Sequence, residues 1–334
     1  MSSPVPTASA QIRVDQAFED GGRTLAEDAL DGLTQPFKEL PPKHLYDSRG
    51  AELFEQICEL PEYYPTRTER SILERHADQI IEQSGAGELV ELGSGSATKT
   101  RLLLDAMSRA GTLERYVGVD VTELAVRDSA ESLIEEYPGL LVHGLIGDFE
   151  RHLDRLPAPL TRRLFVFLGG TIGNFRPGSR RRFLRTLAGL LQPGDNLLLG
   201  TDLIKDRTTL EAAYDDAAGV TALFNRNMIH VINRELGGDL EPDEFDHVAF
   251  FDTRNEWIEM RLRARSAQST VLDAIGLRVE FAAGEELRTE ISAKFTRERL
   301  EADLAAAGLA MSEWMTDERG WFALSLSARA RHVT

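Results

Sequence analysis

The stretch Glu88–Lys99, ELVELGSGSATK, runs from an apolar segment into a glycine turn and then into a helical pattern. A strand that ends in such a turn directs backbone N–H groups of a helix N-terminus toward a ligand, and glycines let that ligand approach closely. The turn therefore favours a nucleotide-like ligand over a plain tight turn. Taken alone it is a weak signal, because the third glycine of the dinucleotide fingerprint is absent and Ala97 stands nearby instead.

The segment around this turn alternates between short apolar runs and longer helical patterns, from about Thr66 to Asp202. Continuous apolar runs separated by helices are typical of parallel strands that are covered on both faces. The runs predict strands at Glu88–Leu92, Tyr116–Val119, Leu140–Ile146, Arg163–Leu168 and Asn196–Gly200. The sequence therefore predicts an α/β fold with a Rossmann-like, doubly wound core.

The pattern changes between about Lys205 and Lys294. Residues 210–236 predict a helical region that stops at Gly237 and Gly238. Residues 256–265, EWIEMRLRAR, alternate strictly between apolar and charged side chains, which predicts a half-exposed antiparallel strand. Shorter alternating segments follow at 277–284 and 289–295. We interpret the block as an α+β insertion, after which the core resumes with a helix at 295–309 and a strand at 321–329.

Length and charge narrow the classes of protein. At 334 residues the chain exceeds the usual single-domain size, which predicts one large domain with an insertion or two domains. The formal net charge of −17 would repel a phosphate backbone, so nucleic acid is not an expected partner. The basic run Arg180–Arg182 is expected to be the solvated face of a helix whose apolar residues Phe183, Leu187 and Leu190 face the core.

Cysteine, histidine and hydropathy patterns exclude further classes. The single cysteine, Cys58, rules out an internal disulfide and fits a reducing cytosol, so a cytoplasmic location is expected. No window has the apolar stretch that a signal peptide or membrane span needs, and no membrane partner is expected. The seven histidines lack the spacing of metal ligands, so no metal is expected. We expect residues 1–20 to be disordered and the protein to be a monomer.

Two further strand ends carry residues that suit a nucleoside. Asp120 closes the apolar run after the glycine turn, at the spacing where a carboxylate accepts the hydroxyls of a ribose. Asp148 and Phe149 close the next run and offer an acceptor and an apolar ring to an adenine. All lie at carboxyl ends of predicted strands, where ligands of open α/β sheets bind. NAD and S-adenosylmethionine both fit this pattern.

The chain resembles class I methyltransferases more closely than dehydrogenases. It has Glu91-x-Gly93-x-Gly95 after the first strand, an acid ending the second, Gly-Asp-Phe ending the third, and a late helix followed by an antiparallel strand. S-adenosylmethionine has no pyrophosphate, so the missing third glycine matters less. The Asn-Pro-Pro-Tyr type motif of adenine and glutamine-amide methylation is absent, which argues against those acceptors.

A closer resemblance is to the L-histidine Nα-methyltransferases of ergothioneine biosynthesis. Its motifs are LPPKHLYD, LPEYYPTRTE, FLGGTIGNF, LLLGTDLIKD, YDDAAGVTALFNRN, FAAGEE and TEISAKF, spread from about Leu40 to the C-terminal strand. The resemblance implies that the enzyme trimethylates the α-amine of L-histidine to hercynine, with S-adenosylmethionine as the methyl donor. It implies a discontinuous substrate-binding domain at 21–65 and 205–294, and a methyltransferase domain at 66–204 and 295–334.

The resemblance also assigns roles to individual residues. Those implied to contact S-adenosylmethionine are Gly93, Lys99, Asp120, Asp148 and Phe149. Those implied to bind histidine are Tyr63, Asn174, Tyr214, Met260, Glu290 and Ser292, with Met260 in the wall around the substrate. Tyr46 and Gly169 are implied to lie near the reacting amine, as the catalytic pair. Two positions depart from the family pattern: Gly170, where serine is common, and Ala293, where cysteine occurs.

The residue types suit these roles. Glu290 and Ser292 are two apart on an alternating segment, so both side chains lie on one face of the predicted strand. A carboxylate that accepts an imidazole N–H, beside a hydroxyl at the other ring nitrogen, would select histidine over apolar amino acids. Asn174 suits a substrate carboxylate. The alternatives are a solvated strand face for Glu290 and Ser292, a turn residue for Asn174 and a packing aromatic for Tyr214.

Methyl transfer to an amine needs a neutral nitrogen held at the right distance, and an α-amine titrates near ~8. The sequence therefore predicts proximity catalysis by positioning, without a metal. Three alternatives stay open: the same scaffold acting on another amino acid or a small amine, a non-catalytic S-adenosylmethionine-binding protein, and a nicotinamide-linked dehydrogenase.

Overall fold

The apolar runs of the sequence form a central mixed sheet. The computed structural model describes residues 11–17, 24–95 and 97–330. Strands β3 to β7 of this sheet are parallel, whereas β14 runs antiparallel to β7 and to β13. The sheet order is β1 (Ile12–Gln16), β5 (Leu141–Ile146), β4 (Arg115–Asp120), β3 (Glu88–Leu92), β6 (Arg163–Phe167), β7 (Asn196–Asp202), β14 (Phe322–Arg329) and β13 (Leu309–Thr316).

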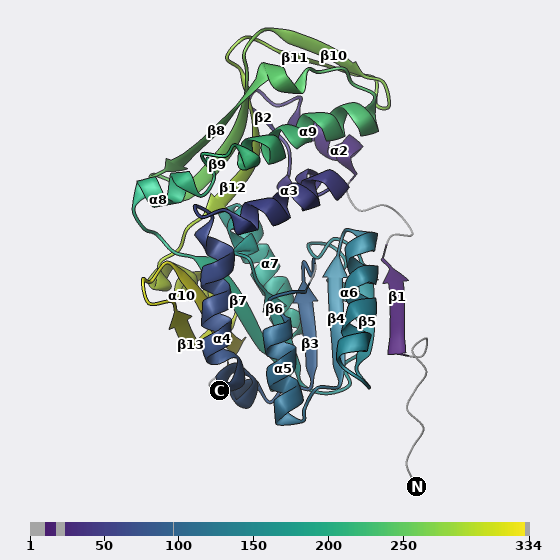
Figure 1. The fold of residues 1–334 in the computed structure, drawn as a ribbon, viewed down its shortest axis with the longest axis vertical. Helices are drawn as coiled ribbons and strands as arrows, with labels where there is room; N and C mark the ends of the chain where they lie inside the picture. The colour runs from purple at the N-terminus through teal and green to yellow at the C-terminus, as the bar shows by residue number, and fades with distance from the viewer. Residues whose placement is uncertain (1–10, 18–23, 96, 331–334) are drawn as a thin grey trace.

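Helices cover both faces of this central sheet (Figure 1). On one face, apolar side chains of α4 (Tyr64–Ser84), α5 (Arg101–Ala110) and α6 (Glu123–Glu136) pack on the strands. On the other face, α7 (Pro177–Leu190) and α10 (Arg297–Ala306) do so. The predicted Rossmann-like, doubly wound core is therefore confirmed.

A second layered unit, here called the accessory lobe, sits above the carboxyl ends of the parallel strands (Figure 1). Its sheet has the order β2 (Lys38–Glu39), β12 (Glu286–Ala293), β9 (Trp257–Ala264) and β8 (Phe245–Asp252). Its helices are α2 (Leu25–Gly32), α3 (Ser48–Glu59), α8 (Arg207–Ala212) and α9 (Val220–Leu236), and a hairpin of β10 (Gln268–Leu272) and β11 (Leu277–Phe281) extends it. The chain enters the lobe twice, from 24 to 63 and after β7.

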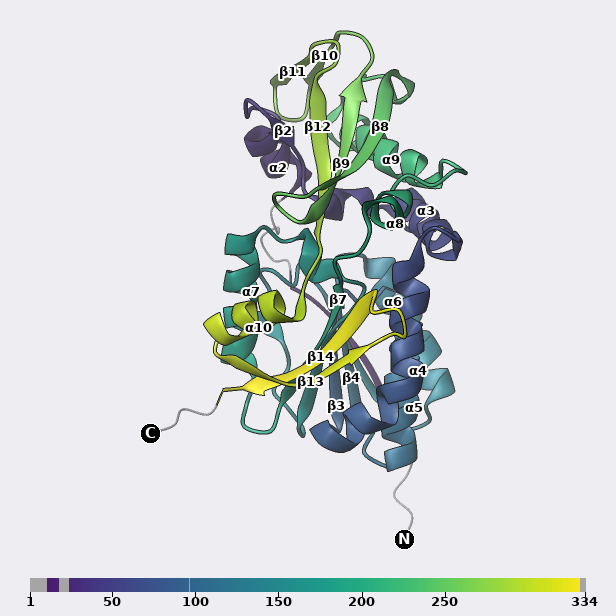
Figure 2. The same cartoon turned by 90° about the vertical axis from the view of Figure 1, so that its left-hand side faces the viewer.

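The accessory lobe buries an apolar cluster of its own, built from α3, α9 and the inner faces of β8, β9 and β12. Strand β12 then descends from the lobe toward α10 and the central sheet (Figure 2). Because β12 ends at Ala293 and Phe295 lies in the core of the central sheet, this strand is a direct link between the two units.

The prediction of disorder over residues 1–20 is wrong for part of that range. Ile12–Gln16 forms β1, which pairs in parallel with the edge of β5. Asp15 accepts a hydrogen bond from His143 across this pair, at 3.0 Å between Oδ2 and Nε2. A five-residue edge strand with mixed polarity is too short to stand out by its periodicity. The rest of the predicted segment, 1–10 and 18–20, lies outside the described residues.

Two element boundaries and one strand differ from the sequence-based prediction. The helical region at 210–236 is broken: α8 ends at Ala212, and α9 begins at Val220 after Gly219, which has a φ of 76°. The Asp216 carboxylate accepts the N–H groups of Val220 and Thr221 and so starts α9. Helix α5 begins at Arg101, several residues after the glycine turn. Strand β13 was not predicted, because its exposed and buried residues do not alternate cleanly.

The basic run on α7 is not wholly solvated. Arg180 is only 2% exposed, whereas Arg181 and Arg182 are exposed as predicted. The Arg180 guanidinium pairs with Asp303 of α10 at 2.7 Å and lies 4.9 Å from the centre of the Phe295 ring. Its burial is possible because the carboxylate compensates the charge. Arg180 therefore joins α7 to α10 rather than facing solvent.

Candidate active site

The glycine turn and the end of β4 form one hydrogen-bonded unit. Gly93 and Gly95 have φ values of 74° and 46°, which favour glycine because it has no Cβ. The Gly95 N–H donates to Asp120 Oδ2 at 2.9 Å, and the Thr122 N–H donates to Asp120 Oδ1 at 2.9 Å. Each carboxylate oxygen accepts one backbone hydrogen bond and retains a free lone pair. Asp120 is therefore held in place and can still accept hydroxyl groups.

Phe149 lies beside this turn. A Cβ placed on Gly93 would lie 3.6 Å from Phe149 Cε1. The Phe149 ring packs against Phe167 at 5.2 Å between centroids and belongs to an aromatic cluster that also contains Phe175 and Phe183. The neighbouring Asp148 accepts the Glu150 N–H at 2.8 Å. The Asp120 carboxylate and the Phe149 ring thus lie at the glycine turn, and Asp148 directly precedes Phe149 at the end of β5, a set that fits the ribose and adenine of S-adenosylmethionine.

A buried carboxylate, Glu69 of α4, connects two predicted site residues. Glu69 pairs with the Lys99 ammonium and accepts the Gly169 N–H at 2.8 Å and 3.0 Å. It sits over Gly200, where a Cβ would lie 2.1 Å from Glu69 Oε1, so only glycine leaves room for it. Sequence reasoning missed Glu69, which lies inside the LPEYYPTRTE motif but carries no signal of its own. Lys99 and Gly169 are thus brought together at the ends of β3 and β6.

A second buried acid, Glu91, lies beneath the glycine turn. It accepts hydrogen bonds from Thr100 Oγ1 and from Tyr116 Oη, the latter at 2.6 Å. Burial raises the pKa of Glu91 to about 7, and these two hydrogen bonds act against that rise. Glu91 therefore ties β3 and β4 to the residues that precede α5.

Glu290 is a buried carboxylate with no hydrogen-bond partner among the described residues. It lies on β12 and is 8% exposed. Within the described part of the chain no group donates a hydrogen bond to it, and burial raises its pKa to about 7, with the charge of Lys294 acting against that rise. Met260, on β9, pairs with Glu290 across the sheet and is 2% exposed. A buried acid with free lone pairs suits a ligand that brings its own N–H donor.

Ser292, two residues along β12, belongs to a buried polar network. The Tyr214 hydroxyl donates to Ser292 Oγ at 2.9 Å. The Lys294 ammonium donates to Ser292 Oγ at 2.9 Å and to Tyr214 Oη at 3.0 Å, and pairs with Asp202 at 2.8 Å. Asp202 also accepts from Tyr64 Oη at 2.8 Å. Tyr214 and Ser292 are therefore neighbours, as their predicted roles require.

Two tyrosines reach this network from the segment before α4. The Tyr63 ring lies 6.2 Å from that of Tyr214, edge to face. The Tyr46 ring packs on the rings of Phe54 and Phe224, with 5.3 Å and 5.4 Å between ring centroids. Burial raises the pKa of both hydroxyls well above the ordinary value, and the charge of Glu290 adds to the rise in each. The Asp120 carboxylate adds to it at Tyr46 as well, which puts Tyr46 within electrostatic reach of both sites.

Asn174 ends the 3-10 turn η3 (Thr171–Asn174), which packs against β12. A Cβ placed on Gly173 would lie 2.8 Å from the Ala293 carbonyl oxygen and 3.0 Å from the Ala293 nitrogen, so this close approach needs glycine. Asn174 is half-buried next to the strand that carries Ser292. The structure thus brings the predicted substrate residues into one region, while their contacts with histidine stay predictions.

Sequence reasoning missed two asparagines of α9, although both lie in the YDDAAGVTALFNRN motif. Asn225 accepts from Thr289 Oγ1 at 2.5 Å and donates to His247 Nδ1 at 2.9 Å, and His247 Nε2 bonds the Tyr214 carbonyl at 2.8 Å. This series of hydrogen bonds links Thr289, the residue before Glu290, to Tyr214. Asn227 donates to Asp47 Oδ1 at 2.6 Å and so holds the residue after Tyr46.

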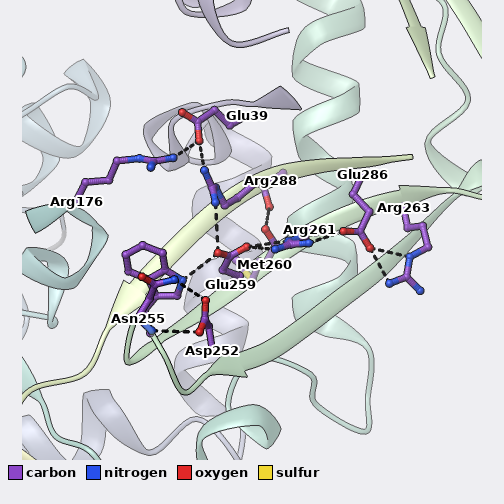
Figure 3. Close-up of polar contacts among 12 residues, drawn as sticks. Glu39, Arg176, Asp252, Asn255, Glu259, Met260, Arg261, Arg263, Glu286 and Arg288 are labelled. Atoms are coloured by element: carbon purple, nitrogen blue, oxygen red, sulfur yellow. Dashed lines mark hydrogen bonds and ion pairs between the residues drawn. The ribbon is translucent and has the colours of Figure 1, made fainter. Parts of the chain in front are cut away.

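The outer face of the accessory sheet carries an ion-pair network (Figure 3). Glu39 of β2 pairs with both Arg176, at the start of α7, and Arg288 of β12. Glu259 is 3% exposed and accepts from Arg261 at 2.8 Å and from Arg288 at 3.3 Å. The charged face of β9 was predicted to be solvated, and this is wrong for Glu259, because the arginines and Trp257 cover it. The network joins the lobe to the central sheet two residues beyond Asn174.

Within the described ranges, no group of three or more His, Cys, Asp or Glu side chains is arranged to hold a metal ion. None of the described helices has the length and apolar character needed to cross a membrane.

Comparison with known proteins places this geometry in a family. Residues 25–329 match the family described as "Histidine-specific methyltransferase, SAM-dependent". The histidine N-alpha-methyltransferase of Mycolicibacterium smegmatis is 52% identical over 94% of this chain and 97% of its own length. Ergothioneine biosynthesis protein 1 of Schizosaccharomyces pombe is 33% identical over 64% of this chain, which matches 29% of that longer protein.

Among solved structures, the CcbJ methyltransferase of Streptomyces caelestis aligns with a TM-score of 0.44 and 17% identity over 77% of this chain and 95% of its own. The family match covers nearly the whole described chain, including both β12 and the glycine turn. The chain therefore belongs to the S-adenosylmethionine-dependent, histidine-specific methyltransferases.

Proposed function

We propose that this enzyme transfers three methyl groups in succession to the α-amine of L-histidine and so makes hercynine, the first step of ergothioneine biosynthesis. The family membership and the histidine N-alpha-methyltransferase of Mycolicibacterium smegmatis support this activity. The observation that carries it in the structure is the buried Glu290 carboxylate, to which no described residue donates a hydrogen bond, on the same face of β12 as Ser292. An imidazole would complete this arrangement.

The residues divide the work between the two ligands. S-adenosylmethionine would be held by Gly93, Asp120, Asp148 and Phe149. Lys99, which forms an ion pair with Glu69, would also contact it. When bound, S-adenosylmethionine supplies a methyl group activated by a sulfonium.

Histidine would be held by the other group of residues. Glu290 and Ser292 would bind the imidazole, and Asn174 together with the Tyr63 hydroxyl would bind the carboxylate. Tyr214 would line the site beside Tyr63, with its hydroxyl donating to Ser292. Met260 would pack beside the ring, because it pairs with Glu290 across the sheet.

Positioning, rather than strong base chemistry, would drive the reaction. The Tyr46 and Tyr63 hydroxyls keep their protons, because burial raises the pKa of each well above its usual value. They can therefore orient the amine by hydrogen bonding but are poor bases. Since an α-amine titrates near ~8, a fraction of bound substrate is already neutral at neutral pH. Gly169, with a φ of 76°, would place its backbone beside the reacting nitrogen.

We also propose the division of the chain suggested by its sequence, with a substrate-binding domain at 21–65 and 205–294 and a methyltransferase domain at 66–204 and 295–334. The separate apolar cluster of the accessory lobe supports it. We further propose that the protein is a monomer and that it is located in the cytoplasm. Light scattering of the purified protein tests the oligomeric state.

The activity is tested by incubating the protein with L-histidine and trideuteromethyl-labelled S-adenosylmethionine. Mass spectrometry should show one, two and three labelled methyl groups, with fragmentation placing all of them on the α-nitrogen. Histamine, which lacks the carboxylate that Asn174 would bind, should give no product. Methyl groups on the imidazole, or no transfer to histidine while another amino acid reacts, would refute the proposal.

A further inference from the structure

Lys294 is a wholly buried cation that faces the substrate-binding strand. Its side chain has no exposed surface. Its ammonium donates to Asp202 Oδ2 at 2.8 Å, to Ser292 Oγ at 2.9 Å and to Tyr214 Oη at 3.0 Å. A lysine ammonium has three N–H donors and no acceptor, so these contacts use all of them. Ser292 and Tyr214 can therefore act toward Lys294 only as acceptors.

With the Tyr214 hydroxyl as donor to Ser292, this arrangement leaves the Ser292 proton for a ligand. A serine oxygen has two lone pairs and one proton. The lone pairs of Ser292 are occupied by Lys294 and by the Tyr214 hydroxyl, which donates to it at 2.9 Å. The Ser292 proton is what remains for a ligand. Glu290, on the same face of β12, is in its ionised form an acceptor only, so the strand presents one acceptor and one donor.

We propose that Lys294 is a positioning residue that sets imidazole recognition: it makes Ser292 a hydrogen-bond donor, so the site selects the neutral imidazole of histidine. In that form one ring nitrogen donates to Glu290 and the other accepts from Ser292. An imidazolium has two N–H donors, and one of them would meet the Ser292 proton. This inference rests on the proposed function and assigns a role to a residue outside the expected contacts.

The charged surroundings agree with this role. The titratable groups around Ser292 are Glu290 on β12 and Lys294 just after it, Asp202 and Lys205 at and after the end of β7, and Tyr214 before α9. The Lys294 charge favours the ionised, accepting form of Glu290, because it lies near that carboxylate. Lys205 pairs with the same Asp202 at 2.6 Å and bonds Tyr64, not Ser292.

The test compares Lys294→Met with a matched control, Lys205→Met. Both variants remove one cation from Asp202, but only the first frees Ser292. Calorimetry, in the presence of S-adenosylhomocysteine, measures the affinity for L-histidine and for the two isomers of pyrrolylalanine. Each isomer keeps one ring N–H and replaces the other nitrogen with C–H, so Ser292 loses its acceptor.

Wild type and Lys205→Met should favour histidine over the better pyrrole isomer by about tenfold or more, since an unpaired buried donor costs about 1–3 kcal/mol. In Lys294→Met this preference should fall below about threefold, because Ser292 can turn its proton away from the ligand. A preference unchanged in Lys294→Met would overturn the inference. If that variant does not fold, Lys294→Met with Asp202→Asn removes both charges, and Ser292→Ala should lose the preference in the same way.

The pH dependence gives an independent readout. Histidine binding to the wild type should weaken below pH ~6.5, where imidazole takes up a proton, by more than pyrrolylalanine binding does. Because the pyrrole ring does not titrate, the pH dependence of pyrrolylalanine binding reports the protonation of Glu290 alone. Histidine binding that strengthens relative to the pyrrole as the pH falls would show that imidazolium is bound, against the inference. Failure of the proposed function would be seen separately, as a wild type that neither binds nor methylates histidine.

Discussion

At the scale of single residues, Glu290 shows how a binding group is kept at a cost to stability. Its folded pKa of about 7 lies above the ordinary value of 4.5, so the fold favours the protonated form. The stability that this proton contributes is fully present below pH 4.5 and is lost as the pH rises through 7. Above pH 7 the protein therefore carries a buried charge that Lys294 compensates only in part.

Glu290→Gln should accordingly raise the free energy of unfolding by about 2 kcal/mol at pH 8 and by close to nothing at pH 4.5. Denaturant unfolding at the two pH values measures the difference. The same variant should lose histidine binding, because an amide is a weaker acceptor than a carboxylate.

The matched control for this variant is Glu286→Gln on the same strand. Arg261 and Arg263 bond Glu286 and lower its pKa, so it contributes stability at high pH that is lost as the pH falls through the folded pKa. Glu286→Gln should therefore destabilise the protein at pH 8. Equal effects of the two variants at pH 8 would contradict this account of β12.

The sequence predicted which residue types stand at the site but not their partners. Glu290 and Ser292 could be placed on one face of a strand because alternation has a period of two. Local patterns do not encode that Glu69 binds Lys99 or that Arg180 is buried against Asp303, because these contacts span 30 and 123 positions of the sequence.

At the scale of elements, α9 organises both sides of the substrate site. Asn225 connects Thr289 on β12 to His247, and His247 holds the Tyr214 carbonyl. Helix α9 could be predicted from its apolar spacing and its glycine stop, and its start could have been found from Asp216 and Gly219. Its inward asparagines could not be distinguished from packing residues, since their role depends on strands that follow later in the chain.

Asn225→Ala should raise the KM for histidine by at least about fivefold, equivalent to about 1 kcal/mol, because Thr289 and Tyr214 lose their common support. The affinity for S-adenosylhomocysteine should not change. Steady-state kinetics and calorimetry measure the two quantities.

Asn233→Ala is the control on the same helix. Asn233 bonds the Leu240 carbonyl at 2.7 Å and the Leu240 N–H at 3.1 Å, away from the site. Its loss should lower stability by about 1–2 kcal/mol and leave the KM for histidine unchanged. A KM raised equally by both variants would mean that Asn225 acts through general stability alone.

At the scale of the whole molecule, the site exists because two layered units meet at the carboxyl ends of the parallel strands (Figure 2). The central sheet supplies the glycine turn, Asp120 and Phe149, and the lobe supplies Tyr46, Glu290 and Ser292. Glu39 pairs with both Arg176, at the start of α7, and Arg288 on β12, and so links the central unit to the lobe (Figure 3).

The doubly wound core was predictable from this chain, because buried parallel strands are continuous apolar runs. The lobe was recognisable as an insertion from the change of pattern. Its packing over the strand ends was not predictable from periodicity, since the meeting of the two units depends on long-range contacts such as that of Gly173 with Ala293.

The central claim is that the lobe holds the imidazole so that the α-nitrogen faces the methyl donor. A crystal structure of the protein with S-adenosylhomocysteine and L-histidine tests it most directly. We predict an imidazole between Glu290 and Ser292, a carboxylate at Asn174 and an α-nitrogen directed at the sulfur. Histidine bound with its ring away from Glu290, or with its α-nitrogen turned from the sulfur, would contradict the account.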